Sequence, residues 1–299
     1  MYRLSFVLVA AFVSLSALSQ TTLLKQRKFP RDIPAGNYSG VTPLGNGRFA
    51  VVNDKSAEDG FYIFSIDIDS LSNCIRSARN EGFVSSGKTN SDLEAIAFCP
   101  NSGTLFMASE AKSEVLEYNL TGQPTGRSLP LPAVFKKASE NCGIESLTFG
   151  HQRFYVTTER PLPGDSLLRI QSFDSQLKCS KQYLYRPDGQ TLKKGYWGVS
   201  ELCALNDGRL LILEREIRVP KLKIGAQALV KIYATRPAEA DTLQKELLCQ
   251  FKTRLTLTSR RFANYEGMCE ARPGLLLLIA DSQNRYKGFL RDWLLTISL

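Results

Sequence analysis

The segment DLEAIAFCPNSGTLFMASEA, residues 92–111, decides the fold. Two short apolar runs flank a turn that contains Pro, Asn, Ser and Gly, and the second run ends in an acid. Apolar runs of this length on either side of such a turn are typical of a β-hairpin. The segment therefore predicts two antiparallel strands.

The same plan recurs four more times along the chain. The matching segments are NYSGVTPLGNGRFAVVNDKS (37–56), GIESLTFGHQRFYVTTERP (143–161), VSELCALNDGRLLILERE (199–216) and NYEGMCEARPGLLLLIADSQ (264–283). Further strand-like stretches follow the middle three hairpins, so each repeat is expected to hold four antiparallel strands. Four-stranded units that recur about every 40–50 residues are characteristic of a β-propeller. We predict an all-β propeller of five blades; a sixth, divergent blade within residues 217–263 is the alternative.

The last repeat is one strand short, because only FLRDWLLTISL (289–299) follows its hairpin. A β-like piece, TTLLKQRKF (21–29), stands unassigned near the other end of the chain. We predict that this piece forms the outer strand of the last blade. Such closure by the N-terminal strand would remove the open sheet edge.

The N-terminal residues have the features of a signal peptide. Arg3 precedes an apolar run over residues 4–18, and small residues stand just before Gln20. A membrane anchor is the alternative, although the run is short for a spanning helix. We expect a signal peptide over residues 1–19 and one propeller domain over residues 20–299. The mature chain is expected to be secreted or periplasmic, monomeric and without a transmembrane segment.

The composition restricts the classes of site. Lys and Arg number 38 against 29 Asp and Glu, which gives a net charge of +9. The basic residues are scattered, which argues against nucleic-acid binding and leaves a solvated surface or the attraction of anionic substrates. The single histidine, His151, excludes a His-rich metal site. It lies in a turn at the end of its hairpin that is opposite the acids described next.

Two sets of side chains align when the repeats are stacked. The first set stands where the first strand of each hairpin begins: Ser39, Glu94, Glu145, Glu201 and Glu266. The second set stands where the second strand ends: Asp54, Glu110, Glu159, Glu214 and Asp281. The two positions are 15, 16, 14, 13 and 15 residues apart in the successive repeats. Because the start of one strand lies opposite the end of its hairpin partner, both sets are expected at one mouth of the channel.

Nine of these ten positions are acidic. Converging carboxylates repel one another and lose hydration, so some must protonate or a cation must neutralise them. Oxygen ligands select a hard cation, and Ca²⁺ accepts six to eight of them with loose geometry. We expect calcium at these nine acids. A salt-bridged ring without metal is the alternative, because Lys55, Arg160 and Arg215 directly follow three of the acids.

The strand starts YSG, LEAI, IESL, SEL and YEGM and the strand ends TTER and LERE resemble the phytase-like family, also called "esterase-like activity of phytase". The resemblance covers roughly residues 33–296. It implies a secreted bacterial propeller and, by the family name, hydrolysis of phosphoesters or carboxylesters with calcium. The matching positions are Tyr38, Ser39, Gly40, Glu94, Glu145, Glu159, Arg160, Glu201, Glu214, Arg215, Tyr265, Glu266 and Gly267.

These observations together predict a metal-assisted hydrolase that acts on a small anionic ester at the channel mouth. The residues expected to hold the metal or to act as general base are Glu94, Glu145, Glu201 and Glu266. The residues expected to bind the substrate are Arg160, Arg215 and Lys55, since cationic side chains suit phosphate or carboxylate oxygens. The alternative is a non-enzymatic propeller that binds a ligand or partner in a calcium-dependent manner. The absence of a recognisable nucleophile–base pair in the sequence favours that alternative.

Overall fold

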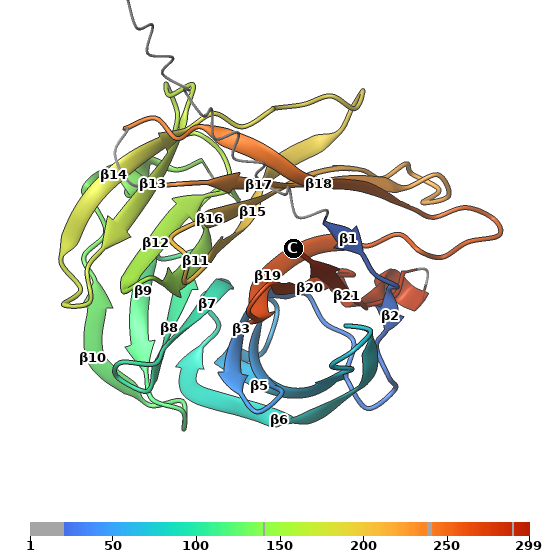
Figure 1. Cartoon of the computed structure of the whole chain (residues 1–299), viewed down its shortest axis with the longest axis horizontal. Coiled ribbons are helices and arrows are strands. Elements are labelled where there is room, and N and C mark those ends of the chain that lie inside the picture. Colours follow the sequence, from blue (N-terminus) through green and yellow to red (C-terminus); the bar gives the residue numbers. More distant parts are fainter. Residues whose placement is uncertain (1–20, 140, 238–240, 289) are drawn as a thin grey trace, which may run out of the picture.

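The computed structural model of the chain describes residues 21–299, apart from residues 140, 238–240 and 289. The predicted signal peptide, residues 1–19, lies outside the described residues. Five antiparallel sheets surround a central axis, which confirms the predicted β-propeller (Figure 1). Among the described residues the helices are two short 3-10 turns, η1 (Ala133–Lys137) and η2 (Asn284–Gly288), and none is long and apolar enough to cross a bilayer.

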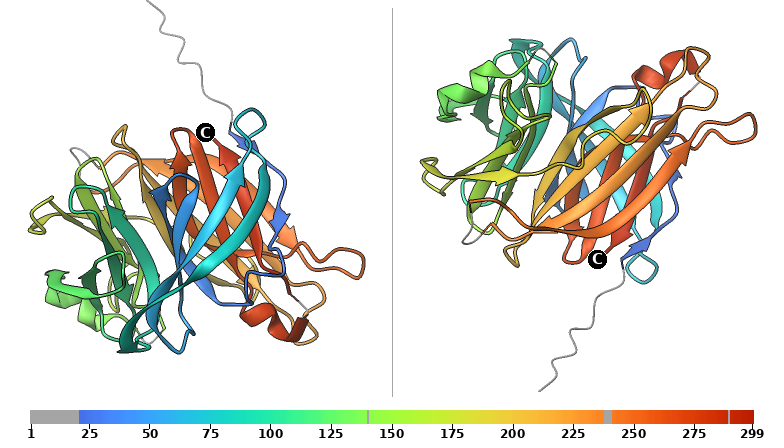
Figure 2. Two further views of the ribbon diagram at one scale, coloured as in Figure 1. Left: turned by 90° about the horizontal axis from the view of Figure 1, so that it is seen from below. Right: turned by 90° about the horizontal axis from the view of Figure 1, so that it is seen from above.

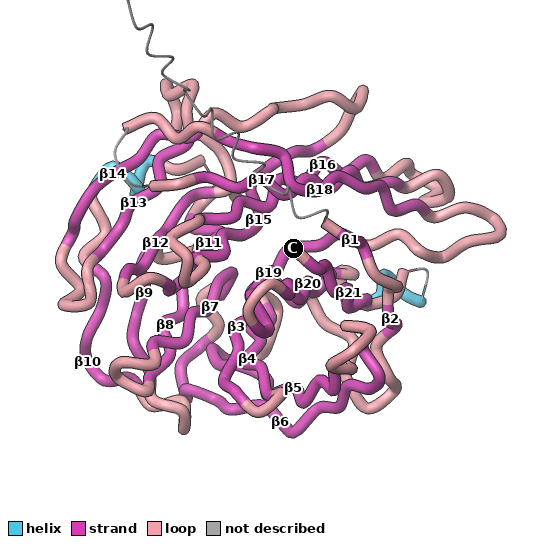
Figure 3. Tube along the Cα trace, in the orientation of Figure 1, coloured by secondary structure: helices cyan, strands magenta, loops and turns pink. Residues whose placement is uncertain are grey.

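Each of the first four blades is a simple up-and-down sheet with its first strand innermost (Figure 3). Blade 1 holds β3 (Tyr38–Gly45), β4 (Arg48–Asn53), β5 (Glu58–Ile68) and β6 (Ile75–Thr89). Blade 2 holds β7 (Leu93–Cys99), β8 (Thr104–Ser109), β9 (Glu114–Tyr118) and β10 (Pro124–Leu129). Blade 3 holds β11 (Ile144–Gly150), β12 (Arg153–Thr158), β13 (Leu168–Phe173) and β14 (Cys179–Tyr185). Blade 4 holds β15 (Tyr196–Ala204), β16 (Leu210–Arg218), β17 (Gln227–Thr235) and β18 (Lys245–Arg254).

Blade 5 is closed by the N-terminal piece, as predicted. It holds β19 (Asn264–Arg272), β20 (Leu275–Asp281) and β21 (Trp293–Ser298). The outer position is filled in two steps, by β1 (Thr22–Leu23) and β2 (Arg27–Lys28), which both pair antiparallel with β21. The alternative of a sixth blade is wrong, because the described part of residues 217–263 supplies strands of blade 4.

The closure gives a prediction on stability. The backbone N–H of Leu24 donates to the carbonyl of Thr296 at 3.1 Å. Replacing Leu24 by proline removes this donor, and we expect the unfolding free energy to fall by about 1 kcal/mol. Urea unfolding measures the difference. Leu24→Ala keeps the N–H and is the matched control; equal losses in both variants would assign the effect to the side chain instead.

Packing between the blades is close enough to demand small residues on the inner strands. A Cβ on Gly267 of β19 would stand 2.5 Å from the carbonyl oxygen of Ser39 on β3. A Cβ on Gly40 of β3 would stand 2.8 Å from the Cα of Ala95 on β7. The inner strands of neighbouring blades therefore touch backbone to backbone, and this contact fixes where their first residues point.

A β-bulge near the start of every inner strand positions the site. The pairing of the two hairpin strands shifts register there in all five blades. Beyond the bulge, each hairpin contains an equivalent regular pair: Val41–Val51, Ile96–Met107, Leu147–Val156, Leu202–Ile212 and Met268–Leu278. A bulge leaves an extra residue unpaired and re-aims its side chain. Residues in different blades can therefore be compared by counting their positions from these five pairs.

Candidate functional site at the channel mouth

Counting from those five pairs identifies which residues are equivalent in space. The residue two positions before the pair on the inner strand lies in or beside the bulge: Ser39, Glu94, Glu145, Ser200 and Glu266. The residue three positions after the pair on the second strand follows the hairpin: Asp54, Glu110, Glu159, Arg215 and Asp281. We call these ten residues the mouth ring. Seven of the ten are acidic, and blade 4 contributes a serine and an arginine.

The predicted ring positions of Glu201 and Glu214 are therefore wrong by one residue. Glu201 lies beyond the bulge and pairs with Leu213. Its buried Oε1 accepts hydrogen bonds from Ser146 Oγ at 2.6 Å and from the N–H of Leu202 at 3.0 Å. It is equivalent to Gly40, Ala95, Ser146 and Gly267 of the other blades.

Glu214 points away from the mouth ring as well. It lies opposite Lys231 on β17. Its Oε1 accepts hydrogen bonds from Tyr185 Oη at 2.5 Å and from Lys245 Nζ at 2.9 Å. The N–H of Asp188 donates to its Oε2 at 3.0 Å. Glu214 thus anchors the loop around Asp188, and it has a structural role in blade 4.

Arg215 occupies the ring position that the sequence assigned to an acid. Its side chain is 6% exposed, and Nη2 lies 2.9 Å from Glu266 Oε1, 3.2 Å from Glu159 Oε1 and 3.3 Å from Glu145 Oε1. Burial alone would lower the pKa of Arg215, but the three carboxylates outweigh it and keep the guanidinium charged. This geometry favours the salt-bridge alternative for Arg215 over a substrate clamp.

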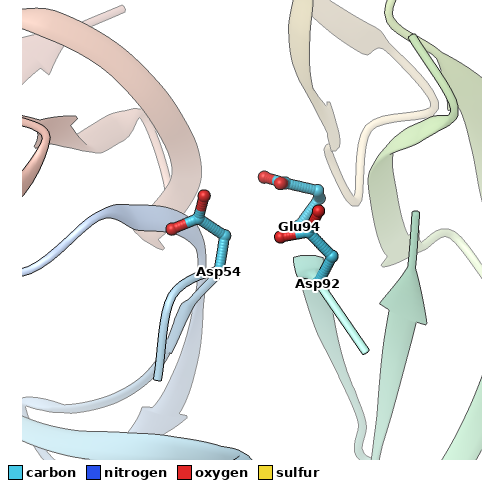
Figure 4. Close-up of side chains that lie close together, drawn as sticks. All are labelled: Asp54, Asp92 and Glu94. Atoms are coloured by element: carbon cyan, nitrogen blue, oxygen red, sulfur yellow. The ribbon is translucent and has the colours of Figure 1, made fainter. Parts of the chain in front are cut away.

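A second group of acids meets between blades 1 and 2. One carboxylate oxygen from each of Asp54, Asp92 and Glu94 lies within 4.8 Å of the others (Figure 4). Lys55 Nζ lies 2.6 Å from Asp92 Oδ1 and 3.1 Å from Asp54 Oδ2, and its side chain is 60% exposed. Asp54 Oδ1 is buried and has no hydrogen-bond partner among the residues that the structure describes. We call Asp54, Asp92 and Glu94 the acidic triad.

Asp92 was not predicted from the sequence. It precedes β7, with a positive φ of 60°, and its N–H is held by Asn90 Oδ1 at 3.0 Å. The equivalent positions of the other hairpins, two residues before the bulge, hold Asn37, Gly143, Gly198 and Asn264. Because no other repeat has an acid there, stacking the repeats gives no signal for it.

Arg160 lies at the mouth but outside the ring. Its guanidinium stacks 4.0 Å from the centre of the Tyr196 ring and 5.2 Å from that of Trp197. Nε donates to the carbonyl of Trp197 at 2.8 Å. Within the described part of the chain its two terminal nitrogens have no acidic or hydrogen-bonding partner. The aromatic rings thus hold a half-buried guanidinium that can still bind an anion.

The remaining histidine is remote from these acids. His151 follows β11 in the hairpin turn, at the end opposite the mouth ring. It lines a cavity of about 230 Å³ together with Thr148 and Glu270. This placement agrees with its predicted position at the end away from the acids.

The family "Phytase-like: Esterase-like activity of phytase" matches residues 33–282. The chain belongs to this family. The match spans every inner hairpin and both groups of mouth acids, and it confirms the resemblance found in the sequence. No curated protein matches the chain significantly.

Two solved structures of low sequence identity are similar to the phytase-like chain. An α-L-arabinofuranosidase from Podospora anserina in complex with cellotriose has a TM-score of 0.50 at 9% identity, over 93% of this chain and 96% of that one. A PQQ-bound aldose sugar dehydrogenase from Streptomyces coelicolor has a TM-score of 0.46 at 13% identity, over 93% of this chain and 98% of that one. Propellers host many activities, so this likeness concerns the fold alone.

Burial is the main influence on the acids of the phytase-like mouth. It raises the pKa of Glu94, Glu145 and Asp281 well above the usual range, and the neighbouring carboxylates raise it further. Burial also raises the pKa of Glu266, to about 7, although Arg215 opposes the shift. A cation bound at the mouth would oppose these shifts by stabilising the charged carboxylates.

These shifts predict how stability depends on pH. The pKa of Glu266 in the folded protein, about 7, lies above its ordinary value of 4.5. The folded protein therefore holds protons that the unfolded chain releases, and the unfolding free energy should fall as pH rises from 5 to 8 in metal-free buffer. Urea unfolding at fixed ionic strength measures this. Glu266→Gln should flatten the profile, whereas a wild-type stability that rises with pH would contradict the assignment.

Proposed function

We propose that this protein is a metal-dependent hydrolase of anionic esters that works at the channel mouth. The observation that supports the proposal most directly is the acidic triad with its unpartnered, buried Asp54 Oδ1. A buried carboxylate oxygen without a partner is costly, and a bound cation would remove that cost. The family name points to ester hydrolysis by analogy.

The donor set suits a hard cation such as Ca²⁺. Asp54, Asp92 and Glu94 offer oxygen ligands exclusively, which calcium prefers and softer metals do not. Lys55 contacts Asp54 and Asp92 of the triad, and because its side chain is 60% exposed it can move into solvent when a cation enters. When bound, such a cation would polarise an ester oxygen and lower the pKa of a water molecule.

The chain itself supplies proton transfer and anion binding. Glu266, with a pKa of about 7, is suited to accept a proton from water at neutral pH. Arg160 presents its terminal nitrogens beside the ring and suits the oxygens of a phosphoryl or carboxyl group. Arg215 holds Glu266 in place through the 2.9 Å contact. With these roles, the three residues would act on a small anionic substrate.

The experiment is a metal analysis of the purified protein, followed by a panel of phosphoesters and carboxylesters with and without chelator. We expect bound calcium and an ester hydrolysis that chelator abolishes and calcium restores. Asp92→Asn should lose the activity in calcium, while Asp241→Asn, which alters an 83% exposed acid elsewhere, should keep it. Hydrolysis that continues unchanged in chelator would refute the metal dependence.

The second candidate is a non-enzymatic propeller that binds a ligand in the presence of calcium. It is favoured by Arg215, which already neutralises part of the ring. The described residues of the mouth also include no hydroxyl–histidine pair, because His151 lies at the other end of the channel. Bound metal without turnover of any ester would select this candidate.

Arg160 and Arg215 are expected to respond differently to the same change. Arg160→Lys keeps the charge but loses the planar fork, so phosphate should bind about 1–3 kcal/mol more weakly while the melting temperature stays unchanged. Arg215→Lys should lower the melting temperature, because an ammonium is more strongly hydrated than a guanidinium and costs more free energy to bury among the three carboxylates. Calorimetric titration with phosphate and a melting curve separate the two effects. Unchanged phosphate affinity in Arg160→Lys would exclude Arg160 from the binding site.

A further inference from the structure

An unusual surface lies on two segments, the loop between β16 and β17 of blade 4 and the connection from blade 4 to blade 5. Residues 219–226 join β16 to β17, and residues 255–263 join β18 to β19. Both project at the same end of the molecule as η2 (Figure 2). Leu222 and Leu257 stand on these loops and are 84% and 85% exposed, and Ile224 is 50% exposed. Single exposed leucines are common, but large apolar side chains at the tips of two adjacent loops are not.

The same two segments are strongly basic. Residues 217–237 and 247–265 contain no acidic residue. In the described part of the chain, seven cationic side chains on or beside the two loops form no ion pair with an acid: Arg218, Lys221, Lys223, Lys252, Arg254, Arg260 and Arg261. We call this surface, with Leu222, Ile224 and Leu257, the basic–apolar rim. No acid among the described residues compensates this positive charge, although Lys223 Nζ lies 4.0 Å from the centre of the Tyr286 ring.

The rim is a built platform, since its two loops are bonded to each other. The N–H of Gly225 donates to the carbonyl of Leu255 at 2.8 Å, and the N–H of Leu255 donates to the carbonyl of Ala226 at 2.9 Å. Beneath them a small apolar cluster joins Ala226, Leu255, Phe262 and Leu290. This cluster and the hydrogen bonds between the loops fix the base from which Leu222 and Leu257 project.

We infer that the basic–apolar rim docks on a bilayer of anionic lipids. Leucine side chains gain free energy when they leave water for the acyl region, and each nearby Lys or Arg is attracted to an anionic surface. Anionic lipid is favoured over nucleic acid as the occupant because the tips carry leucines, whereas single-stranded nucleic acid is bound by stacking on exposed aromatic rings.

The rim lies at the same end of the propeller as the mouth ring. Arg215 belongs to the ring, and β16 continues to Arg218 before the first loop begins. Three further residues of an extended strand span about 10 Å, so the loop tips stand beyond the mouth. The docking rests on the loops alone and does not depend on the proposed hydrolysis or on a metal.

Co-sedimentation of the full chain with vesicles tests the inference. In chelator and 0.1 M salt, we expect the protein to pellet with phosphatidylcholine vesicles that contain a quarter phosphatidylglycerol, and to stay in solution with phosphatidylcholine alone. Raising the salt to 0.5 M should weaken the binding. Leu222→Gln with Leu257→Gln should lower the partition coefficient at least about tenfold. Because both residues are exposed, the melting temperature should not change.

Variants at the end of the propeller opposite the rim lose the same types of side chain and serve as matched controls. Leu71→Gln changes a leucine that is 95% exposed in the turn after β5, and it should bind as the wild type does. Arg260→Gln with Arg261→Gln should weaken binding, whereas Lys178→Gln with Arg236→Gln removes the same charge elsewhere and should weaken it less.

Two results would overturn the inference. The first is equal pelleting of the wild type and the double leucine variant. The second is retention on an oligonucleotide without any pelleting on vesicles, which would identify a nucleic acid as the partner. Because chelator is present throughout, loss of the proposed metal-dependent activity would leave the vesicle result unaffected.

Discussion

Replacing Arg215 by methionine is expected to lower the unfolding free energy by about 3–5 kcal/mol at pH 8. The guanidinium is 6% exposed and lies within 3.3 Å of three carboxylates, so its removal leaves buried negative charges without a partner. Methionine fills a similar volume, which separates the loss of charge from the loss of packing. Urea unfolding at pH 8 in chelator measures the effect.

The same variant should be less impaired at pH 5. Protonation neutralises Glu145 and Glu266, whose pKa values burial already raises, and a neutral carboxyl no longer needs the guanidinium. Arg209→Met is the matched control, because it removes an arginine of the same blade that pairs with a half-exposed Asp207 on the surface. That change should cost less than about 1 kcal/mol. Equal losses in the two variants would mean that Arg215 is not the counter-ion of the ring.

Calcium is expected to stabilise the protein through the acidic triad. At a free concentration one hundred times its dissociation constant, a ligand of the folded state adds about 2.7 kcal/mol to the unfolding free energy. The gain should grow from pH 5 to pH 8, because protons compete with the cation for Asp54 and Glu94, whose pKa values burial raises. Melting curves in calcium and in chelator at both pH values measure the difference.

Asp54→Asn with Asp92→Asn should abolish the shift that calcium causes. The control variant, Asp207→Asn with Asp241→Asn, removes two charges from more exposed sites, where the side chains are 49% and 83% exposed. It should retain the full calcium effect. Identical wild-type melting curves in calcium and in chelator would leave the acidic triad with Lys55 as its sole counter-ion and would remove the basis for a metal-dependent enzyme.

The single register error of the sequence analysis had a detectable cause. Glu201 and Glu214 are 13 residues apart, whereas the other four pairs are 14 to 16 apart. Ser200 and Arg215, which the bulges place in the ring, are 15 apart. The alignment selected Glu201 and Glu214 because they are acidic, although Ser200 and Arg215 fit the spacing of the other repeats. Both assigned positions of blade 4 were therefore wrong by one residue. A one-residue slip turns a strand side chain to the other face, so the counter-ion of the ring was mistaken for a substrate clamp.

The amino-acid sequence alone determined the five hairpins, their order around the axis and the closure by residues 21–29. These features depend on local patterns, namely apolar runs, turn residues and a count of strands, and local patterns are visible in one dimension. The tertiary structure alone decided which side chains meet. The acidic triad joins blades 1 and 2, and Arg215 reaches acids of blades 3 and 5. Such contacts depend on the direction in which the five bulges point the side chains at the start of each inner strand. They depend also on the close approach of neighbouring inner strands, which no single repeat encodes.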